Sequence, residues 1–95
     1  MIKSELDGIY IGLKNTIGFH RSKKHLTFIR QFGEPHHLFG SFSQSLKTSD
    51  YCTIPVTREE HQRAEKDKSA FAIANLGNLI KYLILRIEEL EKRHN

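Results

Sequence analysis

Two adjacent histidines, followed by a histidine and a glutamate one helical turn apart, are the residues of this chain best suited to chemistry. His36 and His37 follow Pro35, and His61 and Glu65 stand four residues apart. Residues four apart share one face of a helix, so His61 and Glu65 can reach one ion, and a histidine of the pair can supply a third ligand. These donors suit a divalent ion, with Mg²⁺, Mn²⁺, Ni²⁺ and Zn²⁺ all open. The other histidine is then free to accept a proton at neutral pH.

These residues also have an ordinary explanation. Histidines in a basic protein are mostly surface residues, and a histidine and glutamate at this spacing on a helix are common by chance. What favours a joint site is the order of the expected elements between them, which is strand, loop, strand and helix.

The segments that must position these side chains have recognisable signals. Residues 20–31 are basic, and Ser22 is a possible N-cap. Together these features predict a short helix that begins near Ser22. Residues 36–39 and 51–54 have the composition of strands, and the stretch 40–49 between them reads as a polar loop. We therefore expect a small hairpin after a basic helix.

A capped helix and a long apolar helix are expected next. Thr57 and Glu60 match a capping box, which predicts that a helix starts there. Whether residues 58–93 form one helix or two stays open, with residues 67–69 as the expected joint. In segment 69–94, apolar residues recur in alternating steps of three and four, which is the spacing of a heptad seam. These residues are Ile73, Leu76, Ile80, Leu83, Ile87 and Leu90. A heptad seam predicts pairing with a second copy, or alternatively packing on its own domain.

The first 19 residues and the composition complete the picture. The alternation of Ile9, Ile11 and Leu13 predicts a short strand, although the glycines around it equally suit a mobile arm. The length of 95 residues predicts one domain, and a net charge of +4 permits a polyanionic partner. With one cysteine, no apolar run of membrane length and no signal-peptide core, we expect a cytoplasmic protein that does not contact a membrane.

Residues 20–66 resemble the HNH nucleases, also called His-Me finger or ββα-metal nucleases, in a phage and prophage branch of that family. The resemblance is carried by the run PHHLFGSFSQSLKTSDYCTIPVTREEHQRAEKD, with its histidine pair, its Ser49-Asp50, its Thr53-Ile54-Pro55-Val56 strand and its histidine-bearing helix. It implies an α+β fold with a small ββα-metal core, a basic helix before the core and a long helix after it.

The resemblance also implies roles for individual residues. His36 and His61 correspond to metal ligands, His37 corresponds to the general base, and Glu65 stands where the family often has another histidine ligand. Cys52 falls near the asparagine of the family motif, so Asp50 is expected to orient the base instead. The positions of the family's structural cysteines hold other residues, so we expect no structural zinc.

The expected function is therefore metal-dependent hydrolysis of DNA phosphodiester bonds, by a homodimer that forms through the C-terminal helix. The alternatives are a non-catalytic nucleic-acid-binding protein on a degenerate HNH scaffold, favoured by Cys52, and an interaction protein built around the C-terminal helix. Basic residues of the 20–31 helix, of the loop and of the next helix start are expected to contact nucleic acid, namely Arg21, Lys23, Lys24, Arg30, Lys47 and Arg58.

Overall fold

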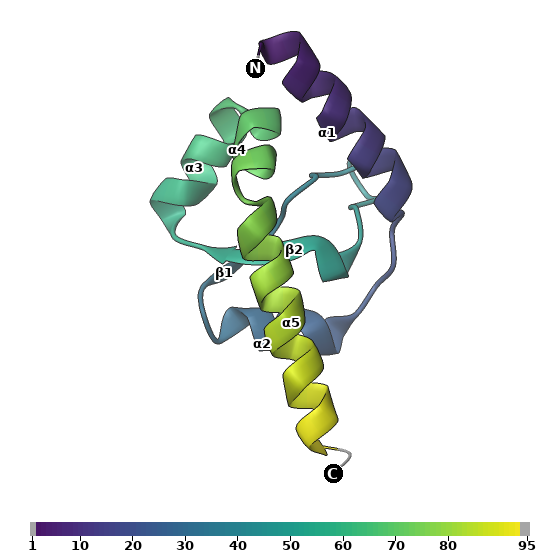
Figure 1. Ribbon diagram of the computed structural model, residues 1–95, viewed down its shortest axis with the longest axis vertical. Helices are drawn as coiled ribbons and strands as arrows, with labels where there is room; N and C mark the ends of the chain where they lie inside the picture. Colours follow the sequence, from purple (N-terminus) through teal and green to yellow (C-terminus); the bar gives the residue numbers. More distant parts are fainter. Residues whose placement is uncertain (1, 94–95) are drawn as a thin grey trace.

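The computed structural model describes residues 2–93, which form a small α+β protein (Figure 1). Within this range there are five α-helices, one short 3-10 helix and a two-stranded antiparallel sheet. The elements follow the order α1 (Lys3–Ile17), α2 (Lys23–Arg30), β1 (Glu34–His37), η1 (Asp50–Cys52), β2 (Thr53–Val56), α3 (Arg58–Lys66), α4 (Lys68–Ala74) and α5 (Leu76–Arg93).

The hairpin of β1 and β2 holds the centre of the molecule (Figure 1). His36 pairs with Ile54 and His37 with Thr53. The predicted hairpin is confirmed, but β1 starts before the expected range and ends at His37 because the next two residues turn into the core. The second strand is Thr53–Val56 rather than residues 51–54, because Asp50–Cys52 form a 3-10 helix. The buried apolar cluster consists of Leu38, Phe39, Ile54, Val56, Ala72 and Leu79, so it joins the hairpin to α4 and α5.

The predicted caps of the two helices beside the hairpin are confirmed. Ser22 accepts a hydrogen bond from the His25 amide at 3.1 Å and so starts α2. In α3 the Thr57 hydroxyl accepts from the Glu60 amide at 3.1 Å, and the Glu60 carboxylate accepts from the Thr57 amide at 2.9 Å. This reciprocal pair fixes the first turn of α3 and hence the direction in which His61 points.

Residues 58–93 form three helices, and the expected single helix from residue 69 onward is two helices, α4 and α5. The expected joint is confirmed, because α3 ends at Lys66 and the carboxylate of the next residue, Asp67, caps α4. A second break, which the heptad pattern does not predict, falls at Asn75, whose side chain donates to the Phe71 carbonyl at 2.9 Å. The axes of α4 and α5 differ by 54° there. Ile73 therefore does not continue the apolar stripe of α5.

The prediction of a short strand in the first 19 residues is wrong, because residues 3–17 form α1, which lies beside α4 (Figure 1). Its inner residues Tyr10, Leu13 and Ile17 follow a helical spacing and pack against the core, whereas Ile9 and Ile11 are exposed. The alternating apolar residues of this segment thus belong to a helix that has apolar side chains on two faces. Lys3 ties this helix to the α3–α4 junction by an ion pair with Asp67.

No single helix in residues 2–93 has the length and apolar character to cross a membrane. Only α4 and α5 counted together, with the bend between them, meet that test of length and composition.

Candidate active site

His36 and His37 end β1 and face different neighbours, as adjacent residues of a strand do. The ring of His36 lies edge-on to that of His61, with 5.0 Å between ring centres, and 5.6 Å from that of Phe71. His37 instead meets Asp50. Directly after β1, Gly40 has a φ of 69°, and its amide donates to the His37 carbonyl at 2.9 Å. The tight turn at Gly40 leaves the end of β1 open.

His61 and Glu65 lie on the face of α3 that looks toward β1. The Nε2 atom of His61 is 3.6 Å from a carboxylate oxygen of Glu65. Together with the histidine pair they surround a hollow of about 170 Å³, lined by Pro35, His36, His37, Gly40, Ser41, Lys47, His61 and Glu65. The structure therefore brings all three expected ligands and the expected base to one hollow. The histidine pair of β1 and the two residues of α3 are at least 24 residues apart in the sequence.

The donor chemistry and spacing of this hollow suit a divalent ion. Metal–nitrogen distances of about 2.1 Å place two ligand atoms of a tetrahedral ion about 3.4 Å apart and two imidazole ring centres about 5 Å apart. The spacings between His61 and Glu65 and between His36 and His61 match these values. The other nitrogen of His61, Nδ1, is buried and has no partner within residues 2–93.

A complete ligand set needs a side-chain adjustment. Within the described chain, no three His, Cys, Asp or Glu side chains are arranged to hold a metal ion as they stand. The Glu65 side chain is 57% exposed and so is free to change rotamer. Residues His36, His61 and Glu65 are thus the ones that would hold the ion.

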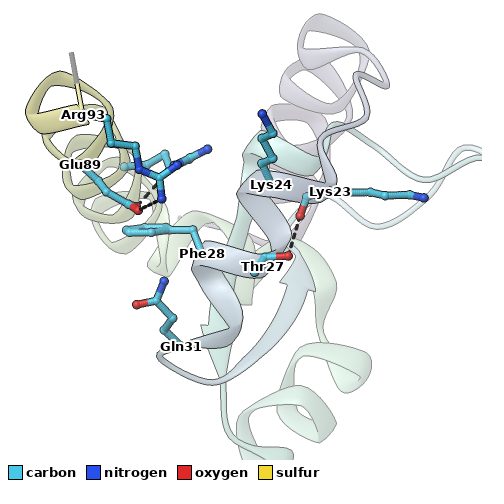
Figure 2. Close-up of a pocket in the computed structure, with 8 residues that line it drawn as sticks. Lys23, Lys24, Thr27, Phe28, Gln31, Glu89 and Arg93 are labelled. Atoms are coloured by element: carbon cyan, nitrogen blue, oxygen red, sulfur yellow. Dashed lines mark hydrogen bonds and ion pairs between the residues drawn. The ribbon is translucent and has the colours of Figure 1, made fainter.

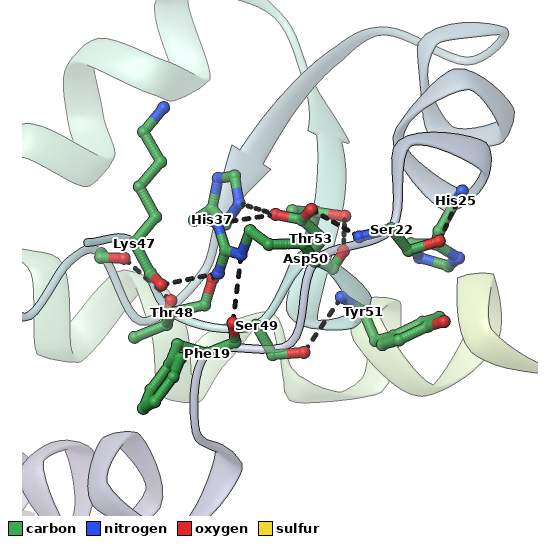
Figure 3. Close-up of polar contacts among 12 residues, drawn as sticks. Phe19, Ser22, His25, His37, Lys47, Thr48, Ser49, Asp50, Tyr51 and Thr53 are labelled. Atoms are coloured by element: carbon green, nitrogen blue, oxygen red, sulfur yellow. Dashed lines mark hydrogen bonds and ion pairs between the residues drawn. The ribbon is translucent and has the colours of Figure 1, made fainter. Parts of the chain in front are cut away.

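Asp50 fixes the orientation of His37 (Figure 3). The His37 Nε2 is 2.8 Å from Asp50 Oδ1, and an ionised carboxylate can only accept, so Nε2 carries the hydrogen. The basic nitrogen of His37 is then Nδ1. Asp50 is itself held by the Ser22 amide, which donates at 2.7 Å, and by the Arg21 guanidinium at 3.1 Å.

Burial sets the protonation of these groups. Burial and the neighbouring His61 lower the pKa of His36 to about 4, which leaves its imidazole neutral and able to ligate a metal. Burial also lowers the pKa of His37, more than the bond to Asp50 raises it. Burial alone would raise the pKa of Asp50, but the bonds from His37 and Ser22 and the charge of Arg21 hold this pKa below its usual value.

Arg21 has a structural role that its basic character does not predict. Its guanidinium donates to the carbonyls of Phe19, Lys47 and Thr48, in addition to the ion pair with Asp50 (Figure 3). These contacts hold the loop before η1 against the start of α2. Through these contacts Arg21 positions Asp50, while its side chain stays 47% exposed, so its contact with nucleic acid stays a prediction.

The other expected nucleic-acid contacts are at the surface. Lys47 is exposed and lines the hollow. Lys23, Lys24 and Arg30 are exposed on α2, and Arg58 is exposed at the start of α3, away from the residues that line the hollow. Cys52 is a half-buried free thiol that packs against the core.

Two residues beside the hollow were not anticipated. Tyr10 of α1 and Lys68 of α4 line a smaller adjoining cavity of about 90 Å³ that shares His36, His37 and Glu65 with the hollow. No motif marks either residue. The helical spacing of Leu6, Tyr10, Leu13 and Ile17 is a signal that could have identified α1 as a helix with Tyr10 on its inner face.

Comparisons of the chain with protein-family models, with curated proteins and with solved structures find no match.

Proposed function

We propose that this protein is a metal-dependent endonuclease of the HNH type that hydrolyses DNA phosphodiester bonds. The observation that carries the proposal is one open hollow that collects His36, His61, the Glu65 carboxylate and a third histidine, His37, whose tautomer is set by a buried aspartate. This combination supplies both the ligands for a divalent ion and a base for water.

In this proposal each residue has one task. His37, with its hydrogen directed to Asp50, accepts the proton of the attacking water at Nδ1. His36, His61 and Glu65 hold the divalent ion, which supplies electrostatic stabilisation of the charge that develops on the phosphate. Lys47 lies at the hollow to pair with a phosphate oxygen.

The proposal is tested by plasmid nicking in Mg²⁺, Mn²⁺ or Ni²⁺, with EDTA as a blank. We expect His37→Ala to abolish nicking and to leave metal affinity, measured by calorimetry, unchanged. His61→Ala should weaken both. His20→Ala, which removes an exposed histidine that does not line the hollow, is the matched control. Equal nicking by the wild type and His37→Ala would refute the assignment.

A non-catalytic nucleic-acid-binding protein is the second candidate, and Cys52 favours it. This thiol stands near the position of the family asparagine, is half-buried against the core, and offers no amide to a neighbouring backbone. In that case, DNA binding persists with no nicking in any of the three metals, and His37→Ala changes neither measurement.

A further inference from the structure

A basic groove between α2 and α5 lies apart from the hollow. It has a volume of about 290 Å³ and is lined by Lys23, Lys24, Thr27, Phe28, Gln31, Arg86, Glu89 and Arg93. Figure 2 shows the two lysines on the α2 side, Glu89 and Arg93 on the α5 side, and the Phe28 ring between the helices. Within residues 2–93, four cations against one carboxylate give this groove a net positive charge.

The groove is built around an almost buried arginine. Arg86 is 8% exposed, and its guanidinium lies 5.7 Å from the centre of the Phe28 ring. Within residues 2–93 it has one hydrogen bond, a long one of 3.4 Å to Glu89. A guanidinium has five N–H donors, so most of those on Arg86 remain for a ligand. The apolar ring beneath it lowers the local dielectric and strengthens its attraction for an anion.

Glu89 holds the arginines in place while leaving the groove cationic. Its carboxylate accepts from Arg93 at 2.6 Å and from Arg86 at 3.4 Å. Arg86, Glu89 and Arg93 are spaced three and four residues apart, so they share one face of α5. Arg93 has a side chain that is 60% exposed and can reach a ligand at the rim.

The chemistry favours a chain of phosphates over a single small anion. Planar guanidinium groups match phosphate oxygens, and cations on both walls of an open groove suit an extended polyanion that passes between them. The α2 wall begins at Ser22, whose amide is bonded to Asp50, the partner of His37. Hydrogen bonds through Asp50 therefore connect the start of the α2 wall to the proposed base.

We infer that the α2–α5 groove binds the phosphodiester backbone of nucleic acid, with Arg86, Arg93 and Lys24 as its main contacts. This inference rests on the proposed action on nucleic acid, but it concerns binding alone. It extends the expected contact surface from α2 to α5, which the sequence pattern assigned to pairing between copies or to packing on its own domain.

The test is fluorescence anisotropy with a labelled DNA duplex of about 20 base pairs, in EDTA, over a series of salt concentrations. Arg93→Gln and Lys24→Gln should each weaken binding about 3- to 10-fold and reduce the salt slope by about one. Lys92→Gln removes the same charge from α5 outside the groove and should change affinity less than about 2-fold. Equal losses in Lys92→Gln and Arg93→Gln would overturn the inference.

A change of opposite sign gives a stricter test. Glu89→Gln removes the only carboxylate among residues 2–93 that lines the groove and should tighten binding about 3-fold or more, whereas Glu91→Gln, outside the groove, should not. Circular dichroism checks that each variant is folded. Weaker or unchanged binding by folded Glu89→Gln counts against the groove, as does a polyglutamate peptide that binds as tightly as DNA with the same dependence on Arg93.

Single-stranded DNA, run in parallel, shows from its affinity which form of the backbone the groove prefers, and its salt slope per phosphate should be smaller. The same variants are assayed for nicking. If the groove variants bind DNA more weakly, and His37→Ala binds DNA normally but does not nick, both proposals stand. If wild-type nicking is normal and the groove variants bind as the wild type does, the groove inference fails while the proposed function survives.

Discussion

Asp50 is the residue on which the orientation of His37 depends. Its carboxylate is 5% exposed and receives His37, the Ser22 amide and Arg21 together. Because an amide in its place can present an N–H to His37, the imidazole can adopt the other tautomer with its hydrogen on Nδ1. Asp50 is therefore a positioning residue for the proposed base.

We predict that Asp50→Asn lowers nicking on the order of 100-fold or more, because the wrong tautomer cannot accept the proton. Metal affinity measured by calorimetry should stay within a few-fold of the wild type. The ¹⁵N chemical shifts of the His37 ring report which nitrogen carries the hydrogen. A general loosening of the fold would not exchange the two nitrogens in this way, so the shifts separate a change of tautomer from a loss of structure. Unchanged shifts together with full nicking would contradict the role given to Asp50.

His25 is a buried histidine without a partner. Its ring is fully buried, it lies against Tyr51 with 5.2 Å between ring centres, and neither nitrogen is hydrogen-bonded within residues 2–93. Burial, together with the charge of Arg86, lowers its pKa below 6.5, while Asp50 acts in the opposite direction. Because the unfolded chain binds the proton more readily, this residue favours folding fully above about pH 6.5 and loses that effect as the pH falls.

We expect His25→Leu to lose less stability than the wild type between about pH 7 and about pH 5. Urea unfolding at the two pH values measures the difference. His20→Gln, at an exposed position, should lose as much as the wild type does. Identical losses in His25→Leu and the wild type would show that His25 does not contribute to acid sensitivity.

At the scale of elements, the cap of α3 supports the candidate site. The Thr57 hydroxyl and the Glu60 carboxylate satisfy two amides at the helix start. This start fixes the turn on which His61 and Glu65 stand. The capping box at the start of α3 thus helps to fix the positions of the two proposed ligands, His61 and Glu65.

Thr57→Ala should destabilise the protein by about 1 kcal/mol, because it leaves a helix-start amide without its partner. The free energy of unfolding from urea titration measures this. Thr57→Ser keeps the hydroxyl and should restore most of the loss. A loss in Thr57→Ser as large as that in Thr57→Ala would mean that side-chain packing, not capping, is responsible.

At the scale of the whole molecule, α5 presents an apolar stripe that no other part of residues 2–93 covers. Leu76, Leu79 and Leu83 of the expected seam and its flank pack on the core, whereas Ile80, Ile84 and Ile87 are 57%, 49% and 54% exposed. They lie on a different face of α5 from Arg86 and Arg93, so covering the stripe leaves the basic groove open.

A second copy of α5 is the occupant that its charges favour. Lys81 and Glu88 flank the stripe on the same side, seven residues apart. In an antiparallel pair centred near Ile84, residues of the same flank face each other, so Lys81 of each helix opposes Glu88 of the other. We therefore propose an antiparallel homodimer, in which two copies of the candidate site act together.

Light scattering at tens of micromolar should give twice the mass of the 11.1 kDa chain. Ile84→Lys should give a monomer, because it places a charge at the centre of the stripe. Glu88→Lys should weaken the dimer and the double change Lys81→Glu with Glu88→Lys should restore it. A wild type that stays monomeric would exclude the pairing.

The sequence by itself determined the features that depend on near neighbours along the chain. The caps at Ser22 and at Thr57 with Glu60, the joint near Asp67 and the shared helical face of His61 and Glu65 follow from residues at most a few positions apart. Local hydrogen bonds and helical periodicity are sufficient to specify such features.

Only the tertiary structure decided which distant residues meet. His37 and Asp50 are 13 residues apart in the sequence. Tyr10 of α1 lines the same cavity as His36, and the Arg86 guanidinium of α5 lies over the Phe28 ring of α2. Residues 3–17 form a helix in which Tyr10, Leu13 and Ile17 pack against the core. The apolar residues that alternate in the same segment give the sequence the pattern of a strand and so hide this helical spacing. These contacts depend on how helices pack around the hairpin, and no spacing along one chain encodes that arrangement locally.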